Sequence, residues 1–295
     1  MAYENFIPTV WNEGIERELE RICVFAEDCN RKYEGSVKEK GESVKILGVG
    51  RPTIKSIAKA NKNSDIDAPE EIEDTSVIMY INQIRYFNYM VGDIDKAQAV
   101  GGIMDALEQE TSEGLANEVD TYIASKAVDE SVKALYGNTP VKVVANENAG
   151  TGEKYVLDIL DEALQKLYEN DVKSTTKIVV TISPRFFTLF KRAYINKDTD
   201  NSEMLKNGRV AKYGNIIVKM SNNVHRTSNG AVDNIMIRTQ RAIAFAKPLT
   251  HTEAYRPEKK FADAVKGFIL FDAKVVRPKE VININVKYAQ GGNEV

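Results

Sequence analysis

The sequence predicts a mixed α+β protein, and three observations support this prediction. Segments 44–49 and 77–86 are rich in β-branched and aromatic residues, which is typical of strands. Residues 95–135 repeat apolar side chains every three or four positions, which is typical of an amphipathic helix. From about Gly150 onward, helix-like and strand-like segments alternate. We therefore expect, in order, a strand-rich region, a long helix, an α/β insertion and returning strands.

The composition is that of an ordinary globular protein. The chain has 295 residues, of which 43% are hydrophobic and 28% charged, and this length suggests about two domains, or one large domain with extensions. The formal net charge is −3, so the overall basic excess of a nucleic-acid-binding protein is absent, which leaves room only for a small basic patch. No stretch approaches about 18 uninterrupted apolar residues and no signal peptide is recognisable, so we expect no membrane partner.

Residues 1–35 are expected to form an extended arm followed by a helix. The apolar residues at helical spacing are Trp11, Ile15, Leu19, Ile22 and Ala26, and Gly35 ends the helix. The two cysteines, Cys23 and Cys29, do not have the spacing of a CxxC metal or redox motif. We expect two half-buried thiols in a reducing compartment.

A long polar segment, residues 51–76, separates the first two strand-like segments. A structureless loop of this length is unusual inside a compact domain, so we expect a protruding hairpin or a partner-binding loop. Its two arms either attract each other in solution, at most about 1 kcal/mol per exposed pair, or lie on a neighbouring subunit and set its register. The charges are segregated, with basic residues first and acidic residues after them: Arg51, Lys55, Lys59 and Lys62, then Asp65, Asp67, Glu70, Glu71, Glu73 and Asp74.

The helix predicted for residues 95–135 would be about 60 Å long if unbroken, at roughly 1.5 Å per residue. Gly101, Gly102 and Gly114 fall inside it, where each costs about 1 kcal/mol relative to alanine. We therefore expect a bend or close packing at these glycines.

The α/β region, about residues 150–255, is expected to begin with a helix over 156–167 and a buried strand, KIVVTIS (177–183). A second helix follows, with Ser183 as its N-cap and Pro184 as its first residue. Further strands are expected at YGNIIVKMSNNV (213–224) and NIMIRTQRAIAFAK (234–247), the latter with a bulge.

The C-terminal segment is expected to supply two more strands, separated by Pro278. The first has an apolar face over residues 269–275. In the second, apolar residues alternate with polar ones, so we expect one of its faces to be solvent-exposed: Ile282, Ile284 and Val286 against Asn283, Asn285 and Lys287.

No catalytic, cofactor-binding or metal-binding motif is found. The chain contains two histidines, His225 and His251, both in polar surroundings and outside any HExxH, EF-hand or Cys/His cluster. GVGRPT (48–53) lacks the third glycine of a dinucleotide fingerprint and the Gly-Lys-Ser/Thr of a phosphate loop. We therefore expect no enzyme activity and no cofactor.

One enzymatic alternative remains open, a cytosolic hydrolase or transferase with its site in the α/β insertion. Asp158, Asp161 and Glu162 would be its candidate groups. Their helical neighbours favour a solvated helix face instead.

Two further features are candidates for contacts with other molecules. Trp11, close to Pro8 on the arm, is either a local core anchor or an anchor docked on a neighbour, since tryptophan is enriched at interface hot spots. The stretch RPEKKFAD (256–263) fits either a soluble edge or an intersubunit salt-bridge patch, and its charged residues are Arg256, Glu258, Lys259, Lys260 and Asp263. With the loop residues Arg51 to Glu71, these are the predicted subunit-interface residues.

The order of these parts, and several phrases within them, resembles the major capsid (coat) proteins of tailed phages that share the HK97-type fold. The branch with the phage P22-like coat proteins is the most similar. The resemblance spans nearly the whole chain, and its specificity lies in the order and spacing of the phrases. They are IPTVWNEG (7–14), DIDKAQA (93–99), LANEVD (115–120), KIVVTISPRFF (177–187), YGNIIVKMSNNV (213–224) and AYRPEKKFADAVKGFILFDAKVVRP (254–278).

The resemblance implies a fold of four parts. Residues 1–35 would be an N-terminal arm with a helix, 36–85 an extended β-hairpin loop, 86–150 and 255–295 a peripheral domain with a long spine helix, and 151–254 an α/β axial domain. In such shells the extended loop lies across an adjacent subunit, and the axial domains meet at the five- and six-fold centres. The apolar strand of residues 269–275 would pack beneath the spine helix.

The resemblance also implies a function, that of a structural protein assembling into the icosahedral shell of a tailed phage or prophage around double-stranded DNA. The partners would be copies of the chain in hexamers and pentamers, a portal, in some shells a decoration protein, and packaged DNA contacted non-specifically. Because the chain starts directly at the arm, we expect a separate scaffolding protein. Assembly would take place in the host bacterial cytoplasm and yield the virion capsid. An encapsulin-like nanocompartment shell, which shares the fold but encloses an enzyme, is the remaining alternative.

Overall fold

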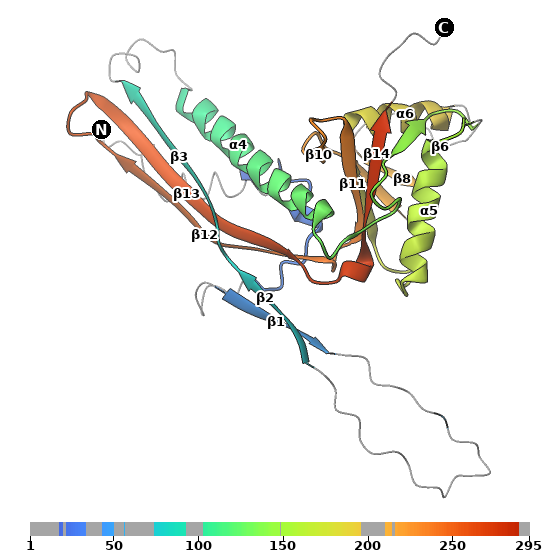
Figure 1. The fold of residues 1–295 in the computed structure, drawn as a ribbon. Coiled ribbons are helices and arrows are strands. Elements are labelled where there is room, and N and C mark those ends of the chain that lie inside the picture. Colours follow the sequence, from blue (N-terminus) through green and yellow to red (C-terminus); the bar gives the residue numbers. More distant parts are fainter. Residues whose placement is uncertain are drawn as a thin grey trace, which may run out of the picture.

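The structure, a computed structural model, describes residues 18–19, 22–33, 43–49, 56, 74–92, 103–147, 149–195, 210–213 and 216–288. Within these residues the chain forms an elongated three-stranded sheet, a nine-stranded sheet and a two-stranded ribbon. Helix α4 lies along the elongated sheet, and helices α5 and α6 lie against the nine-stranded sheet (Figure 1). The mixed α+β class expected from the sequence is confirmed.

The elongated sheet consists of β12 (Ile243–Tyr255), β13 (Ala262–Val275) and β3 (Gln83–Gly92), with β13 in the middle. Both pairings are antiparallel, and β12 and β13 form a hairpin with its tip at residues 256–261. The Phe87 side chain lies over Gly267 of β13, where an added Cβ would be 2.5 Å from the Phe87 ring. Glycine at this position therefore allows the ring to pack directly on the strand.

Helix α4 (Ile103–Ser125) covers one face of the elongated sheet. The Tyr122 ring meets the Phe271 ring of β13 edge-on, with 5.6 Å between centroids. The Tyr122 hydroxyl donates to Asp272 Oδ1 at 2.8 Å. These contacts place β13 beneath the helix, as the sequence predicted.

The helix ends earlier than the sequence predicted. It has 23 residues, about 35 Å in length, and stops at Ser125 rather than at Leu135. A 3-10 turn, η4 (Lys126–Val128), follows, and then Asp129 accepts a hydrogen bond from the Ser131 backbone N–H at 3.0 Å. The apolar rhythm continues past Ser125 because residues after the turn, including Leu135, pack on the same core as the helix.

The packing expected around the glycines of this helix is not seen at Gly114. Gly114 is exposed, and no atom lies within 4 Å of the position its Cβ would take. Gly101 and Gly102 lie outside the described residues.

The nine-stranded sheet has the order β6-β5-β14-β11-β7-β9-β8, with β10 beside β11 and β4 beside β14. Helices α5 (Val156–Glu169) and α6 (Pro184–Ile195) pack against it, and Ser183 caps α6 by accepting the Phe186 N–H at 3.2 Å. The strands are β4 (Lys133–Ala134), β5 (Val141–Val144), β6 (Glu153–Tyr155), β7 (Ile178–Ile182), β8 (Val210–Tyr213), β9 (Ile216–Met220), β10 (His225–Thr227), β11 (Val232–Thr239) and β14 (Val281–Tyr288).

Segments 126–132, 240–242 and 276–280 connect the elongated and nine-stranded sheets. Segment 240–242 breaks residues 234–247, which the sequence predicted as one bulged strand, into β11 and β12 in different sheets. The Ala242 carbonyl accepts the N–H groups of Val276 and Arg277 at 2.9 and 3.1 Å, which binds two of the connections together. Glu280 is the last residue of the short η5 turn (Pro278–Glu280). Its carboxylate accepts hydrogen bonds from Arg241 at 3.1 Å and from Arg277 at 3.0 Å.

The ribbon consists of β1 (Ser43–Val49) and β2 (Asp74–Tyr80), paired antiparallel from Ser43 with Tyr80 to Val49 with Asp74. It projects away from both sheets (Figure 1). Its base is held by a small apolar cluster in which Val44, Ile46, Met79 and Ile81 pack with Ala244 and Ala246 of β12. The strand predicted for 77–86 is therefore two strands, β2 and β3, which meet at residues 81–82.

Each of the two larger sheets combines residues from distant parts of the chain. Residues 133–144 and 281–288 belong to the nine-stranded sheet, and β12 brings residues 243–254 into the elongated sheet. Of the expected solvent-exposed face of the last strand, only Lys287 is exposed, and the expectation is wrong for Asn283 and Asn285, which are only 5% and 7% exposed. The turn after β4 covers this face, where Asn285 donates to the Gly137 carbonyl at 2.8 Å.

Candidate assembly surfaces

Most predicted interface residues lie outside the described residues. They are Trp11 and the loop residues Arg51, Lys55, Lys59, Lys62, Asp65, Asp67, Glu70 and Glu71. The structure does describe both ends of this loop, since Val49 of β1 pairs with Asp74 of β2. It also describes the second predicted cluster, in residues 256–263.

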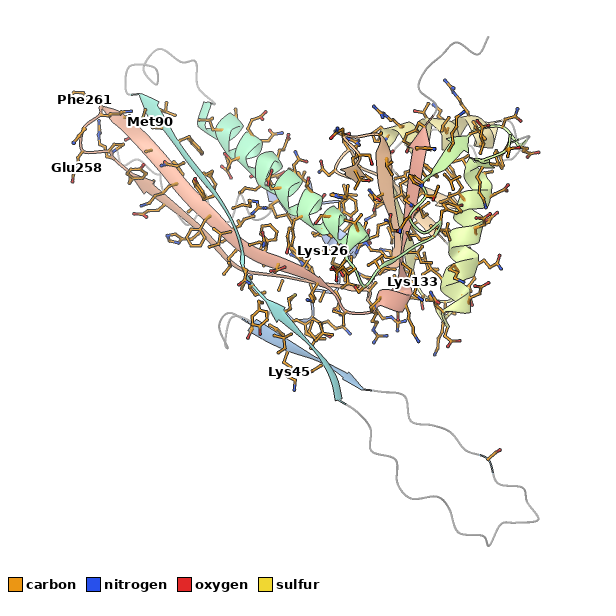
Figure 2. All side chains as sticks on the ribbon, viewed as in Figure 1. Lys45, Met90, Lys126, Lys133, Glu258 and Phe261 are labelled. Carbon is orange, nitrogen blue, oxygen red and sulfur yellow. The ribbon has the colours of Figure 1, made fainter. Side chains whose placement is uncertain are left out.

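This second cluster forms the tip of the β12–β13 hairpin, at the far end of the elongated sheet (Figure 2). Phe261 has 86% of its surface exposed there, and Lys260 Nζ lies 3.7 Å from the Met90 sulfur of β3. The tip therefore joins the predicted charges to a large exposed aromatic ring. The charged residues are Arg256, Glu258, Lys259 and Lys260, all exposed, and the half-buried Asp263.

A second surface, which the sequence interpretation missed, runs along β2 and β3. From Ile78 to Met90 every even-numbered residue is exposed and every odd-numbered residue is at least half-buried. Five of the exposed side chains are large and apolar, with 43 to 80% of their surface exposed. We call these five residues the β2–β3 face: Ile78, Tyr80, Ile84, Tyr86 and Met90.

The β2–β3 face continues onto the neighbouring strand of the elongated sheet. Phe268 and Leu270 of β13 are the register partners of Tyr86 and Ile84, and both are half-buried. Side chains of directly opposed residues in an antiparallel pair point to the same side of the sheet. The apolar surface therefore extends from β3 to the middle strand.

Farther across, along β12, the same side of the sheet is polar. Tyr255 Oη donates to Asn88 Oδ1 at 3.2 Å, and Lys266 pairs with Glu253 at 3.1 Å. The exposed His251 ring lies 5.8 Å from the Phe268 ring. This side of the sheet thus combines an apolar edge with a polar one.

The odd-numbered residues of β3 face the opposite side, under α4. Arg85 Nε donates to Glu118 of α4 at 3.0 Å, and Phe87 packs against the main core. The helix therefore covers one face of β3, while the β2–β3 face is exposed among the residues that the structure describes.

A buried polar network fixes the N-terminal segment to α4. Asp120, 2% exposed, accepts the backbone N–H groups of Val24, Phe25 and Ala26 at 2.7, 3.0 and 3.3 Å. Burial raises the pKa of Asp120 to about 6, while these N–H groups and the Arg238 charge act in the other direction.

The same segment is bound to the nine-stranded sheet from its other side. Arg238 of β11, 1% exposed, donates to the carbonyls of Phe25 at 2.8 Å and Asp28 at 2.6 Å. The Asp28 carboxylate pairs with Lys177 at 2.9 Å and Lys219 at 2.5 Å. Burial alone would raise the pKa of Asp28, but the two lysines outweigh it and lower the pKa.

Both cysteines belong to this buried turn. Cys23 and Cys29 are free thiols with exposures of 5% and 2%, so they are buried and not half-buried as predicted. Burial raises the pKa of both thiols, which keeps them protonated and unreactive at neutral pH.

The candidate groups of the enzymatic alternative lie on the outer side of α5. Asp158 and Asp161 are exposed on α5, whereas Glu162 accepts the Tyr136 hydroxyl at 2.9 Å and pairs with Lys154. Among the described residues, no group of three or more His, Cys, Asp or Glu side chains is placed to hold a metal ion. In the same part of the chain, no helix combines the length and apolar character needed to cross a membrane.

A short repeat in the sequence marks the β2–β3 face. Residues 78–89 read IMYINQ and IRYFNY, two copies of Ile-x-Tyr-x-Asn-x, and Met90 follows. Because side chains alternate along a strand, this spacing puts isoleucine, tyrosine and asparagine on one face. The repeat was the available signal for this surface.

Comparisons with known proteins place this architecture among phage capsids. No family model matches the sequence, and no curated protein matches it. A solved structure from Mycobacterium phage Che8 is similar, with 25% identity, a TM-score of 0.71 and coverage of 90% of this chain and 91% of that chain. The capsid structure of cyanophage P-SCSP1u has 14% identity, a TM-score of 0.63 and coverage of 91% and 89%.

A virus-like particle from Pyrococcus furiosus is similar as well, with 10% identity, a TM-score of 0.57 and coverage of 96% of this chain and 100% of that chain. In each comparison nearly the whole of both chains is matched, so the likeness includes the elongated sheet, α4 and the nine-stranded sheet together. The chain has the α+β fold of the HK97-type phage major capsid proteins.

Proposed function

We propose that this chain is the major capsid protein of a tailed phage or prophage and that its copies assemble into an icosahedral head around double-stranded DNA. It is a structural subunit of the virion capsid and not an enzyme. The observation that carries the proposal is the fold likeness over about nine-tenths of both chains to structures that include a phage capsid.

The exposed surfaces of the subunit support this function. A ribbon that projects from the body and a hairpin tip with an 86% exposed phenylalanine bury little within one subunit. Such features gain stability when they contact other copies. Capsid proteins assemble with copies of themselves, and this chain accordingly has its own copies as partners.

Assembly is tested by expressing the full chain, alone and together with its scaffolding protein, and viewing the product by electron microscopy. We expect closed shells or rings of many subunits that sediment far ahead of a 33.0 kDa chain. A chain that remains a monomer at high concentration, even with its scaffold, would refute the function.

The finer assignments rest on the sequence resemblance. The phrases shared with phage P22-like coat proteins support membership of that branch. We assign α4 and the elongated sheet to a peripheral domain and the nine-stranded sheet to an axial domain at the five- and six-fold centres. Further partners in this proposal are a scaffolding protein, a portal, a decoration protein and non-specifically bound DNA.

The extended loop is proposed to lie on an adjacent subunit. Its ends meet where Val49 pairs with Asp74, so residues 50–73 can be replaced by a two-residue Asn-Gly turn, which suits an antiparallel hairpin. We expect this variant to fold, with thermal unfolding like that of the parent subunit, and to fail to form shells. Normal shells from the shortened chain would remove the loop from the assembly mechanism.

The encapsulin-like nanocompartment is the second candidate, and the virus-like particle with the same fold is the observation that favours it. The contents of particles purified from the native source separate the two candidates. Nuclease-protected double-stranded DNA supports a phage head, whereas a single co-purifying enzyme supports a nanocompartment.

A further inference from the structure

We propose that the β2–β3 face, together with Phe261, is covered by a second copy of this chain in the assembled particle. The inference rests on the proposed function as a shell subunit and adds the surface through which one of its contacts is made. This surface is distinct from the charged residues that the sequence singled out.

Large exposed apolar side chains concentrate on this surface. Eight large hydrophobic residues of the described chain are exposed, and six of them belong to the β2–β3 face or to Phe261. The other two are Val128 and Tyr168. Single exposed apolar residues are normal, but a contiguous row of them indicates an interaction site.

The row is continuous from the base of the ribbon to the hairpin tip. The alternation from Ile78 to Met90 spans about 40 Å at roughly 3.3 Å per residue. At its far end, Lys260 contacts Met90, and the exposed Phe261 follows Lys260 at the hairpin tip (Figure 2). The shape is a long, narrow strip.

The strip has the size that a specific contact between copies requires. Tyr80, Tyr86 and Phe261 are 56%, 80% and 86% exposed. Covering these three rings would remove roughly 300 to 550 Å² from water, given the area that an aromatic side chain buries. Ile78, Ile84 and Met90, each about half exposed, bring the total to the order of the ~800 Å² that one partner buries in a stable interface.

The chemistry of the strip disfavours DNA as its occupant. None of its six residues is charged, the nearby Lys266 is paired with Glu253 at 3.1 Å, and the exposed Lys259 and Lys260 lie only at the tip end of the strip. Non-specific DNA binding depends on lysine and arginine contacts with phosphates. The packaged DNA is therefore not expected to contact this surface.

A second copy fits both the face and the edge of β3. Among the described residues β3 is the last strand of the elongated sheet, so its outer edge has no strand partner there. Such an edge can take an added strand, and Asn82 and Asn88 offer amide groups between the apolar residues. In a shell every subunit has copies as neighbours, so each copy can cover the strip of another without an additional protein.

The first test measures protection of the strip in particles. Tyr86→Cys places a reactive thiol in the middle of the strip, and Tyr168→Cys places one on α5 to report access of the reagent to the shell. The native Cys23 and Cys29 are buried and give little background. Maleimide labelling at position 86 should be at least about tenfold slower in particles than in dissociated subunits, because the centre of an interface excludes water.

Equal labelling rates at position 86 in particles and in free subunits would overturn the inference while leaving the proposed function intact. The occupant is identified with a photo-crosslinking amino acid at the same position in particles. Adducts of two peptides from this chain support the proposal. Adducts only with a different protein, or only with DNA, overturn it. A parent chain that never forms particles overturns the proposed function and the inference together.

A second test uses charge. Tyr86→Lys should leave the free energy of unfolding of the subunit within about 0.5 kcal/mol, since it alters an exposed side chain, and should abolish particle formation. Tyr168→Lys is the matched control, a tyrosine on α5 outside the strip, and should assemble with the yield of the parent. Particles formed equally well by the Tyr86→Lys subunit would contradict the proposal.

Discussion

Asp120 and Arg238 bind the same buried turn from opposite sides. Asp120 of α4 accepts the N–H groups of Phe25 and Ala26, and Arg238 of β11 donates to the carbonyl of Phe25 at 2.8 Å. One belongs to the helix over the elongated sheet and the other to the nine-stranded sheet. The N-terminal turn therefore ties the two halves of the subunit together through backbone groups of residues 24–28.

Asp120→Ala is expected to destabilise the subunit strongly. It leaves three buried backbone N–H groups without their acceptor, and each such group costs about 1–3 kcal/mol. We expect a loss of about 3 kcal/mol or more in the free energy of unfolding, measured by urea denaturation of the unassembled chain. Glu118→Ala, on the same helix but 59% exposed at its side chain, is the control and should cost less than about 1 kcal/mol.

Asp120 should make a contribution to stability that decreases as the pH rises. A salt-bridged carboxylate, whose pKa is lowered, has the opposite effect. The pKa of Asp120 is about 6 in the folded chain, above its ordinary value of 3.8. Between these values the folded state binds the proton more tightly, so the stability from this group falls as the pH rises through the window. The change is on the order of 2–3 kcal/mol.

Urea denaturation at several values between pH 4 and pH 7 measures this contribution. Asp120→Asn cannot titrate, so its stability should lack the decline that the parent shows as the pH rises. Identical slopes for the two chains would show that Asp120 has an unshifted pKa.

Gly267→Ala should destabilise the elongated sheet. Its Cβ would lie 2.5 Å from the Phe87 ring and 2.8 Å from the His251 carbonyl oxygen, and the backbone atom cannot easily move. Overpacking of this kind costs about 1–3 kcal/mol. A thermal melt of the subunit should show a lower Tm, and an unchanged Tm would mean that Phe87 takes another rotamer at no cost.

Gly114→Ala should have the opposite effect. The position is exposed in the interior of α4, and nothing lies within 4 Å of its Cβ. Replacing glycine by alanine in a helix interior gains up to about 1 kcal/mol. The same thermal melt should show a higher Tm, and a decrease would indicate a close contact at Gly114 in the free subunit.

The sequence predicted the helices and strands better than it predicted where they end and which of them pair in one sheet. The long helix and the cap at Ser183 followed from periodicity and local chemistry, whereas the place of the apolar strand beneath the helix followed from the family resemblance. The periodicity of residues 95–135 could not show where the helix ends, because Leu135 packs on the same core from outside the helix. Similarly, the polar residues 239–241 interrupt the apolar run 234–247, and this interruption was interpreted as a bulge within one strand instead of a passage between two sheets.

The candidate surfaces show the same limit. Charge segregation drew attention to the loop and to residues 256–263, because charges are conspicuous in a sequence. Ile84 and Tyr86 were interpreted as ordinary strand residues, and the structure shows them exposed because α4 covers the other face of β3. For Asn283 and Asn285 the error was the reverse. Both were predicted to be exposed, but a turn distant in sequence covers them.

The Glu280 carboxylate accepts hydrogen bonds from Arg241 and Arg277. It therefore joins segments 240–242 and 276–280, two of the connections between the halves of the subunit. Neither sheet crosses this seam, so tilting one half against the other would leave both hydrogen-bonded ladders intact while it shifts the polar contacts and the apolar core that the halves share. In an icosahedral shell of pentamers and hexamers, the same polypeptide must occupy two kinds of position that differ in curvature. In the proposed shell, a seam of this kind would let the chain take both positions without refolding either half.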